Sequence, residues 1–139
     1  MVIILKYCMR NSKVIRAIES SQKEREIQLA KAINLIATGV LVRDPNRLDI
    51  RGAIHCGNDV EIDSNVVFEG EVILEDGVII GSNCILKNCT IGKNSQVHPF
   101  SLIEDSIVGE HSFVGPYGRL RPGTTIGDNV QIGNFVEIK

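Results

Sequence analysis

A six-residue repeat dominates the chain from residue 48 onward. Apolar residues recur at every sixth position, and the interval shortens to five residues at two places. These anchors are Ile50, Cys56, Ile62, Phe68, Leu74, Ile80, Leu86, Ile91, Val97, Ile103, Val108, Val114, Leu120, Ile126, Ile132 and Ile138. A six-residue cycle leaves room for a short strand and a sharp turn. The repeat therefore predicts a solenoid of stacked coils, in which each coil depends on its neighbours to bury its apolar side.

The residue two positions before each anchor supports the same interpretation. From Val60 onward, none of these residues is larger than valine. Positions i and i−2 of a strand face the same side, so a bulky residue there would crowd a narrow interior. Glycine follows several anchors and leads into turn-forming residues, as in Gly92-Lys93-Asn94 and Gly127-Asp128-Asn129. Aromatic residues make up only 4% of the chain, which argues against a conventional globular core.

The segment before residue 40 has a helical period. We expect a helix from about Ser12 to Thr38, ended by Gly39, and a division of the chain into residues 1–39 and residues 40–139. An apolar stripe is predicted along this helix at Ile15, Ile18, Leu29, Ile33 and Ile36, interrupted by Glu26. The polar run 22–26 predicts a break or a frayed turn, and the charges of residues 23–26 predict a solvated face.

Charge and hydropathy exclude several classes of function. The formal net charge is −2, whereas a protein that binds nucleic acid needs a basic face. No apolar run is long enough to cross a bilayer, and the first residues do not have the order of a signal peptide. We therefore expect a cytoplasmic protein without a nucleic-acid or membrane partner.

Cysteine and histidine residues do not form a pattern typical of a reactive or metal site. The four cysteines include no Cys-x-x-Cys pair, and Cys56, Cys84 and Cys89 occupy inward positions of the repeat, where packing explains them. His55, His98 and His111 occupy different phases of the repeat. We therefore predict surface histidines, no metal site and no catalytic residue.

Local motifs add a resemblance to the repeat. The register [LIV]-G-x-x-x-x resembles the hexapeptide-repeat family, which folds as a left-handed parallel β-helix with three hexapeptides in each coil. The segments 41–45, 51–52, 59–63, 115–123 and 133–139 are similar to the bacterial family of bifunctional N-acetylglucosamine-1-phosphate uridyltransferases and glucosamine-1-phosphate acetyltransferases. The pair R-L-R-P-G and N-F-V-E-I-K is the most specific part. The resemblance implies about five coils preceded by a helix that corresponds to the linker between the two domains of that family.

The resemblance also implies roles for two residues and limits the activity that we expect. Arg121 and Lys139 match positions that contact the sugar-phosphate acceptor in the family. The nucleotidyltransferase domain has no counterpart in the chain, and the family's catalytic His and its acetyl-CoA coils lie beyond the matched motifs. The resemblance therefore implies acetyl-CoA as a co-substrate of the family only, with no cofactor bound by this chain alone, and a homotrimer with sites between subunits.

The spacing of Arg121 and Lys139 gives an independent reason to single them out. They are 18 residues apart, which is one full coil, so two cations are expected to lie one above the other. An anion such as a sugar phosphate would stabilise that arrangement. The alternatives are two solvated cations or an arginine paired with a neighbouring carboxylate.

Three functional hypotheses follow from the sequence. The first is a truncated relative of the bifunctional enzyme of UDP-N-acetylglucosamine, peptidoglycan and lipopolysaccharide synthesis, carrying part of the acceptor site and inactive alone. The second is a non-enzymatic trimeric scaffold or binding module. The third is an independent acyltransferase that uses one of the three histidines as a general base.

Overall fold

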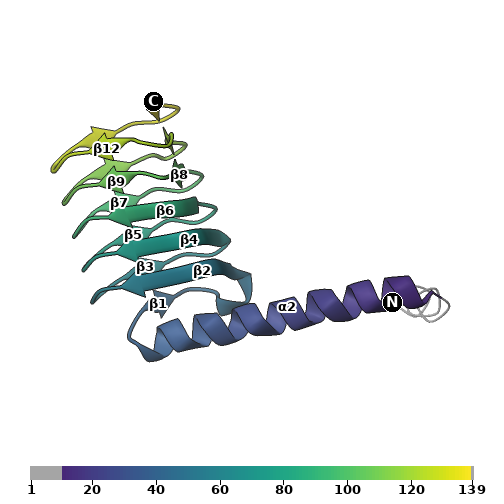
Figure 1. Cartoon of the computed structure of the whole chain (residues 1–139). Coiled ribbons are helices and arrows are strands. Elements are labelled where there is room, and N and C mark those ends of the chain that lie inside the picture. Colours follow the sequence, from purple (N-terminus) through teal and green to yellow (C-terminus); the bar gives the residue numbers. More distant parts are fainter. Residues whose placement is uncertain (1–10, 139) are drawn as a thin grey trace.

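The chain folds into a parallel β-helix that follows one long helix, as the repeat predicts. A computed structural model describes residues 11–138 (Figure 1). The strands pair in parallel and form a solenoid of about five turns, with α2 (Ser12–Ala37) lying across its first coil. The predicted fold class is therefore confirmed. Within the described part of the chain, α2 and the short helix η1 (Pro45–Arg47) are each too short or too polar to span a membrane.

The strands line three faces of the solenoid. Face A consists of β1 (Leu41–Val42), β3 (Glu61–Ile62), β5 (Ile79–Ile80), β7 (Gln96–Val97), β10 (Phe113–Val114) and β13 (Gln131–Ile132). Three longer strands turn a corner and supply faces B and C together, namely β2 (Leu48–Cys56), β4 (Val66–Leu74) and β6 (Ile85–Ile91). Face B continues with β8 (Leu102–Glu104), β11 (Arg119–Leu120) and β14 (Glu137–Ile138). Face C continues with β9 (Ile107–Val108) and β12 (Thr125–Ile126).

The predicted anchors form the core. All of them are buried except Cys56, Ile132 and Ile138, which are half-buried and lie in the first and last coils. Equivalent anchors stack in register, for example Phe68 on Ile50 and Leu86 on Phe68. Each coil therefore completes the burial of the one below it, which is the source of stability in a repeat protein.

The small inward residues of the middle coils also form hydrogen bonds between coils. Ser95 Oγ donates to the carbonyl of Gly109 at 2.6 Å and accepts from the amide of Ser112 at 2.9 Å. Ser112 Oγ in turn donates to the carbonyl of Gly127 at 2.7 Å. The sequence predicted only that these residues are small. The structure shows that their hydroxyl groups satisfy buried backbone groups, which would otherwise cost free energy.

Helix α2 matches the predicted bounds but is continuous. The side chain of Asn11 accepts hydrogen bonds from the amides of Lys13 and Val14 at its start, and Gly39 follows its end with a φ of 104°. The break predicted at residues 22–26 is absent from the described helix. Good helix formers such as Gln, Lys and Glu fill that run, and their propensity outweighs the missing apolar stripe.

The side of α2 that docks on the solenoid differs from the predicted stripe. Gln28, Ala32 and Leu35 are buried, whereas Ile18, Ile33 and Ile36 of the predicted stripe are each at least 39% exposed. The prediction was wrong because the docking face is partly polar. Its role is to satisfy the backbone of the first strand as well as to pack against the core.

Three polar side chains of α2 bind the outer edge of β2. Gln28 accepts a hydrogen bond from the Ile50 amide at 2.7 Å and donates to the Ile50 carbonyl at 3.2 Å, and Lys31 Nζ donates to the same carbonyl at 2.8 Å. Arg25 donates to the Leu48 carbonyl at 2.8 Å. Unpaired strand edges are prone to aggregation, and α2 covers this part of the edge in place of a further strand.

Arg25 departs from the solvated face predicted for residues 23–26, whereas Lys23, Glu24 and Glu26 are exposed as predicted. The Arg25 guanidinium lies 2.8 Å from Asp49 Oδ1, and Arg51 lies 3.1 Å from Asp49 Oδ2. Burial raises the pKa of Asp49, but the hydrogen bonds and charges of Arg25 and Arg51 outweigh it and hold that pKa below its usual value.

We expect Gln28→Ala to destabilise the protein, because the Ile50 amide loses its partner at a buried position and the Ile50 carbonyl keeps only the hydrogen bond from Lys31. The expected loss is about 2 kcal/mol of the free energy of unfolding, measured by urea titration. Gln22→Ala, at an exposed position of the same helix, serves as the control and should change that free energy by less than about 0.5 kcal/mol. Equal effects of the two substitutions would contradict the role of α2 as a cover for β2.

Candidate functional site

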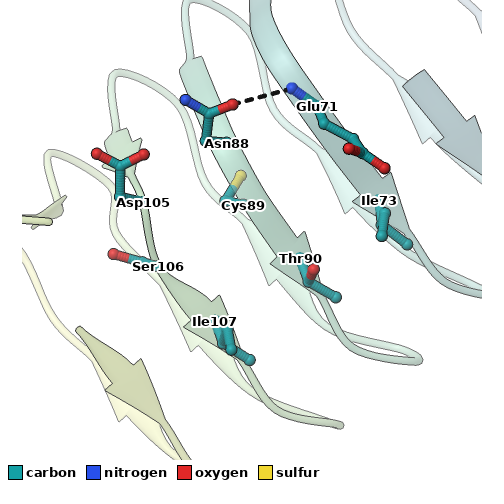
Figure 2. Close-up of a pocket in the computed structure, with 8 residues that line it drawn as sticks. All are labelled: Glu71, Ile73, Asn88, Cys89, Thr90, Asp105, Ser106 and Ile107. Atoms are coloured by element: carbon teal, nitrogen blue, oxygen red, sulfur yellow. Dashed lines mark hydrogen bonds between the residues drawn. The ribbon is translucent and has the colours of Figure 1, made fainter. Parts of the chain in front are cut away.

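A groove of about 500 Å³ lies at the corner between faces B and C, in the middle coils (Figure 2). Its lining residues come from β4, β6, β9 and the turns that lead to them. They are Glu71, Ile73, Asn88, Cys89, Thr90, Asp105, Ser106 and Ile107. The groove is open to solvent, and carboxylate, amide and hydroxyl groups alternate with aliphatic side chains along its walls.

The groove coincides with the two shortened intervals of the repeat. Three residues turn this corner in the first two coils, but only two residues turn it before Cys89 and again before Ser106. The register of β4 with β6 shifts at this point, between Glu69 and Val72. The two middle coils therefore have a shorter turn at this corner than the coils below and above them. The shorter turns leave a hollow between the wider ones.

Asn88 compensates for the residue that the two-residue turn lacks. It has a φ of 47° at a position that Gly70 fills in the coil below. Its Oδ1 accepts a hydrogen bond from the Glu71 amide at 3.0 Å, as Figure 2 shows. Asparagine tolerates this left-handed conformation, and its side chain reaches the backbone that a shorter corner leaves without a partner. Asp105 repeats the conformation one coil higher, with a φ of 44°.

The groove lacks an activated nucleophile. Ser106 Oγ donates to the carbonyls of Glu104 at 2.6 Å and Arg121 at 3.1 Å, so its hydroxyl hydrogen is already engaged with the backbone. Burial raises the pKa of the Cys89 thiol to about 12, and the charge of Asp105 acts in the same direction. A reactive cysteine requires a lowered pKa, so Cys89 is not an activated nucleophile. The groove therefore supports contact with a ligand but not covalent catalysis.

We expect Asn88→Ala to cost about 2 kcal/mol in the free energy of unfolding, because alanine loses the hydrogen bond and adopts a positive φ only at a cost. Asn88→Gly loses the same hydrogen bond but accepts the backbone conformation, so it should be destabilised less than Asn88→Ala. Thermal or urea unfolding of the two variants provides the comparison. Equal losses would show that backbone conformation does not matter at this corner.

Arg121 lies elsewhere, on the outer side of face B. Its backbone amide donates to the carbonyl of Ile138 at 2.9 Å, and its Nη1 lies 3.2 Å from Glu137 Oε1. The side chains of Arg121 and Glu137 are 45% and 43% exposed. The structure thus contains the arginine–carboxylate pair that the sequence left open as an alternative. The second predicted residue, Lys139, lies outside the described residues.

The charges near Arg121 belong to a column that runs along face B. Residues that directly follow the anchors of this face alternate in sign from one coil to the next: Arg51, Glu69, Lys87, Glu104 and Arg121. Arg51 lies 3.3 Å from Glu69 in this column. Exposed pairs of this kind are worth about 0–1 kcal/mol, so the Glu137 contact leaves the Arg121 guanidinium able to bind a stronger anion.

The three histidines are not brought together. His55 lies 3.7 Å from Glu71, His98 lies 3.2 Å from the Gln96 side-chain oxygen, and His111 is exposed at a turn. Within residues 11–138, no group of His, Cys, Asp and Glu side chains has the geometry of a metal site.

The inward cysteines are buried as predicted, with Cys56 only partly so. Burial raises the pKa of the Cys56 and Cys84 thiols to about 11. Cys8 lies outside the described residues.

We expect Cys84 and Cys89 to resist alkylation by iodoacetamide at pH 8 in the folded protein, because few of these thiols are ionised and little of each is accessible. A Cys8→Ser background and peptide mass spectrometry would assign the modified sites, with the urea-unfolded protein as the reactive reference. Labelling of native Cys89 at the rate of the unfolded chain would contradict the buried position of this thiol.

One surface feature was missed by sequence reasoning. Phe100, Tyr117 and Phe135 stack at one corner, with ring centroids 5.2 Å and 5.0 Å apart. Each has a positive φ, and Asn65 and Asn83 have the same conformation in the coils below. The spacing of 17 and 18 residues between aromatic side chains was the signal that could have predicted this ladder.

Comparisons with known proteins find a family model that matches most of the chain. The family model described as "GMPPB C-terminal domain" matches residues 50–139. Among solved structures, the chain is similar to a mutant of perosamine N-acetyltransferase from Caulobacter crescentus, solved in complex with CoA and GDP-perosamine, with 12% sequence identity and a TM-score of 0.34. That alignment covers 79% of this chain and 62% of the other, so the chain spans less than two thirds of that protein.

Proposed function

The chain belongs to the GMPPB C-terminal domain family, and on that premise we propose that it is a sugar-phosphate-binding β-helix domain related to the glucosamine-1-phosphate acetyltransferase domain of the bifunctional enzymes. The family assignment rests on a match over most of the chain. The more specific relationship rests on the motifs R-L-R-P-G and N-F-V-E-I-K, which the repeat alone does not require. Many unrelated functions share a fold, so the proposal has to be argued from the residues of the site.

The observation that carries the proposal is the position of the Arg121 guanidinium. It lies on the outer side of face B, almost half exposed, and a single exposed carboxylate holds it at 3.2 Å. A phosphate offers more charge and more acceptor oxygens than Glu137, and arginine binds such groups through two parallel hydrogen bonds. The sugar phosphate would therefore displace Glu137 from Arg121.

The proposed role is binding of the acceptor rather than catalysis. In the family reaction, the amine of glucosamine 1-phosphate attacks the thioester carbonyl of acetyl-CoA, a base removes the amine proton, and the thiol of CoA leaves. The resemblance assigns that base and the acetyl-CoA site to coils that follow the matched motifs. The proposal for residues 11–138 is therefore confined to the phosphate end of the acceptor.

We further propose that the chain forms homotrimers, as the resemblance implies, with acceptor sites between subunits. Sedimentation velocity would measure this assembly. A monomer at micromolar concentration would contradict this part of the proposal while leaving the binding site of a single chain open to the test below.

We expect glucosamine 1-phosphate to bind the purified chain and Arg121→Ala to weaken that binding about tenfold or more, because a charged hydrogen-bond donor to phosphate is lost. Isothermal titration calorimetry provides the dissociation constants. Arg43→Ala is the matched control, because Arg43 also follows an inward residue of its strand and is exposed on face A. The control should bind as the unaltered chain does.

Two results would contradict the proposal. Unchanged affinity of Arg121→Ala would remove this residue from the site, and the absence of any binding would favour the scaffold. Release of CoA thiol from acetyl-CoA in the presence of glucosamine 1-phosphate would instead favour an independent acyltransferase.

A further inference from the structure

The first coil of the solenoid is covered on two of its three faces. On face A, β1 lies below β3, and on face B, α2 binds the outer edge of β2 through Gln28 and Lys31. Face C begins with the second half of β2, from Gly52 to Cys56. Within residues 11–138, this part of β2 pairs with β4 on one side, and no strand lies on its other side.

The backbone of this segment presents hydrogen-bonding groups to the open side. Ile50 turns its amide and carbonyl toward α2, whereas the Gly57 amide donates to Leu74 in the next coil at 2.8 Å. Backbone groups alternate in direction along a strand, and the register of β2 with β4 is unbroken from residue 48 to residue 56. Ile54 and Cys56 therefore turn their amides and carbonyls toward the open edge.

The side chains at this edge lack cover as well. On face C, the inward positions stacked above Ile54 and Cys56 are all buried, with at most 7% of their surface exposed, from Val72 and Leu74 up to Ile126. Ile54 and Cys56 themselves are only half-buried, although they pack against the same core. One further strand would bury both side chains and pair both sets of backbone groups.

A groove beside this edge can receive a side chain. It has a volume of about 250 Å³ and lies between the last turns of α2, with Leu35 and Thr38, and the strand residues Ile50 and Ile54. Leu35, Ile50 and Ile54 give the groove an apolar wall that favours an aliphatic side chain, and the polar side chains of Lys31, Asn34 and Thr38 line the rest. Because α2 already covers the edge next to Ile50, the space suits a short extended segment of about four or five residues.

We propose that the open edge of β2, from Gly52 to Cys56, binds an extended segment of a partner polypeptide, which adds to face C as a further strand. Every second residue of the segment would be aliphatic, as in β4, whose Val72 and Leu74 cover the opposite edge. A helical partner would not meet the requirement of the edge, because the amides and carbonyls within a helix are already paired with one another. This surface is separate from Arg121, so the proposal for it does not depend on the proposed function.

The test is an NMR titration of the full ¹⁵N-labelled chain with an acetylated, amidated peptide that has the sequence of residues 71–75, Glu-Val-Ile-Leu-Glu. Saturable shifts of the Ile54 and Cys56 amides are expected. Two further peptides carry N-methyl groups on alternate residues, one at the second and fourth positions and the other at the third and fifth. Only one of the two should bind, because only one set of amides faces the strand edge. Equal binding of both, shifts elsewhere only, or no shifts at millimolar peptide would overturn the proposal.

A pair of variants locates the site on the protein. Ile54→Pro removes the amide hydrogen that faces the open edge and leaves the bonds to β4 in place, as proline does on natural edge strands. We expect this variant to lose peptide binding at least tenfold and Ile54→Val to retain it. Unchanged affinity of Ile54→Pro would overturn the proposal. If Ile54→Pro does not fold, the two methylated peptides decide the question on the unaltered chain.

Discussion

Stacking in register is the constraint on which the rest of the structure depends. Each coil places a given type of residue directly above its equivalent, about 4.8 Å away, so every side chain meets a copy of its own position rather than an arbitrary neighbour. Apolar anchors benefit from this repetition, because each of them completes the burial of the next. Like charges would repel one another in such a stack, and on face B the sign of the charge alternates along the column from Arg51 to Arg121.

The same constraint explains how much could be predicted from the sequence. The anchors, the fold class and the bounds of the helix are periodic properties, so a single chain contains many repetitions of the signal. The docking face of α2 is not periodic, because it matches one particular strand edge. Gln28 and Arg25 bind backbone groups of β2, and nothing in their spacing distinguishes that role from exposure to solvent. The sequence therefore predicted the helix but assigned the wrong side of it to the interface.

The candidate sites show a similar division. The exposed position of Arg121 after a buried anchor could be predicted, whereas its partner Glu137 could not, because the pair depends on side-chain conformation and not on register alone. The groove was missed from the sequence for another reason. The two shortened intervals lie 17 residues apart, which is about one coil and places both at one corner, but the hollow between them depends on the side chains of neighbouring coils. Asn88 then emerges as the residue that makes a shorter turn possible.

The shared position of the two shortened turns also bears on how a chain of this kind can change in length. The Asp105 amide donates to the Lys87 carbonyl at 2.9 Å, so the two short turns are bonded to each other. A turn of three residues already adjoins a turn of two residues where β4 meets β6, and the pairing resumes in register at Val72 and Cys89. The solenoid therefore absorbs a difference of one residue at this corner as a local irregularity, without displacing the strands that follow. The length of this turn can thus vary from coil to coil while the anchors stay stacked.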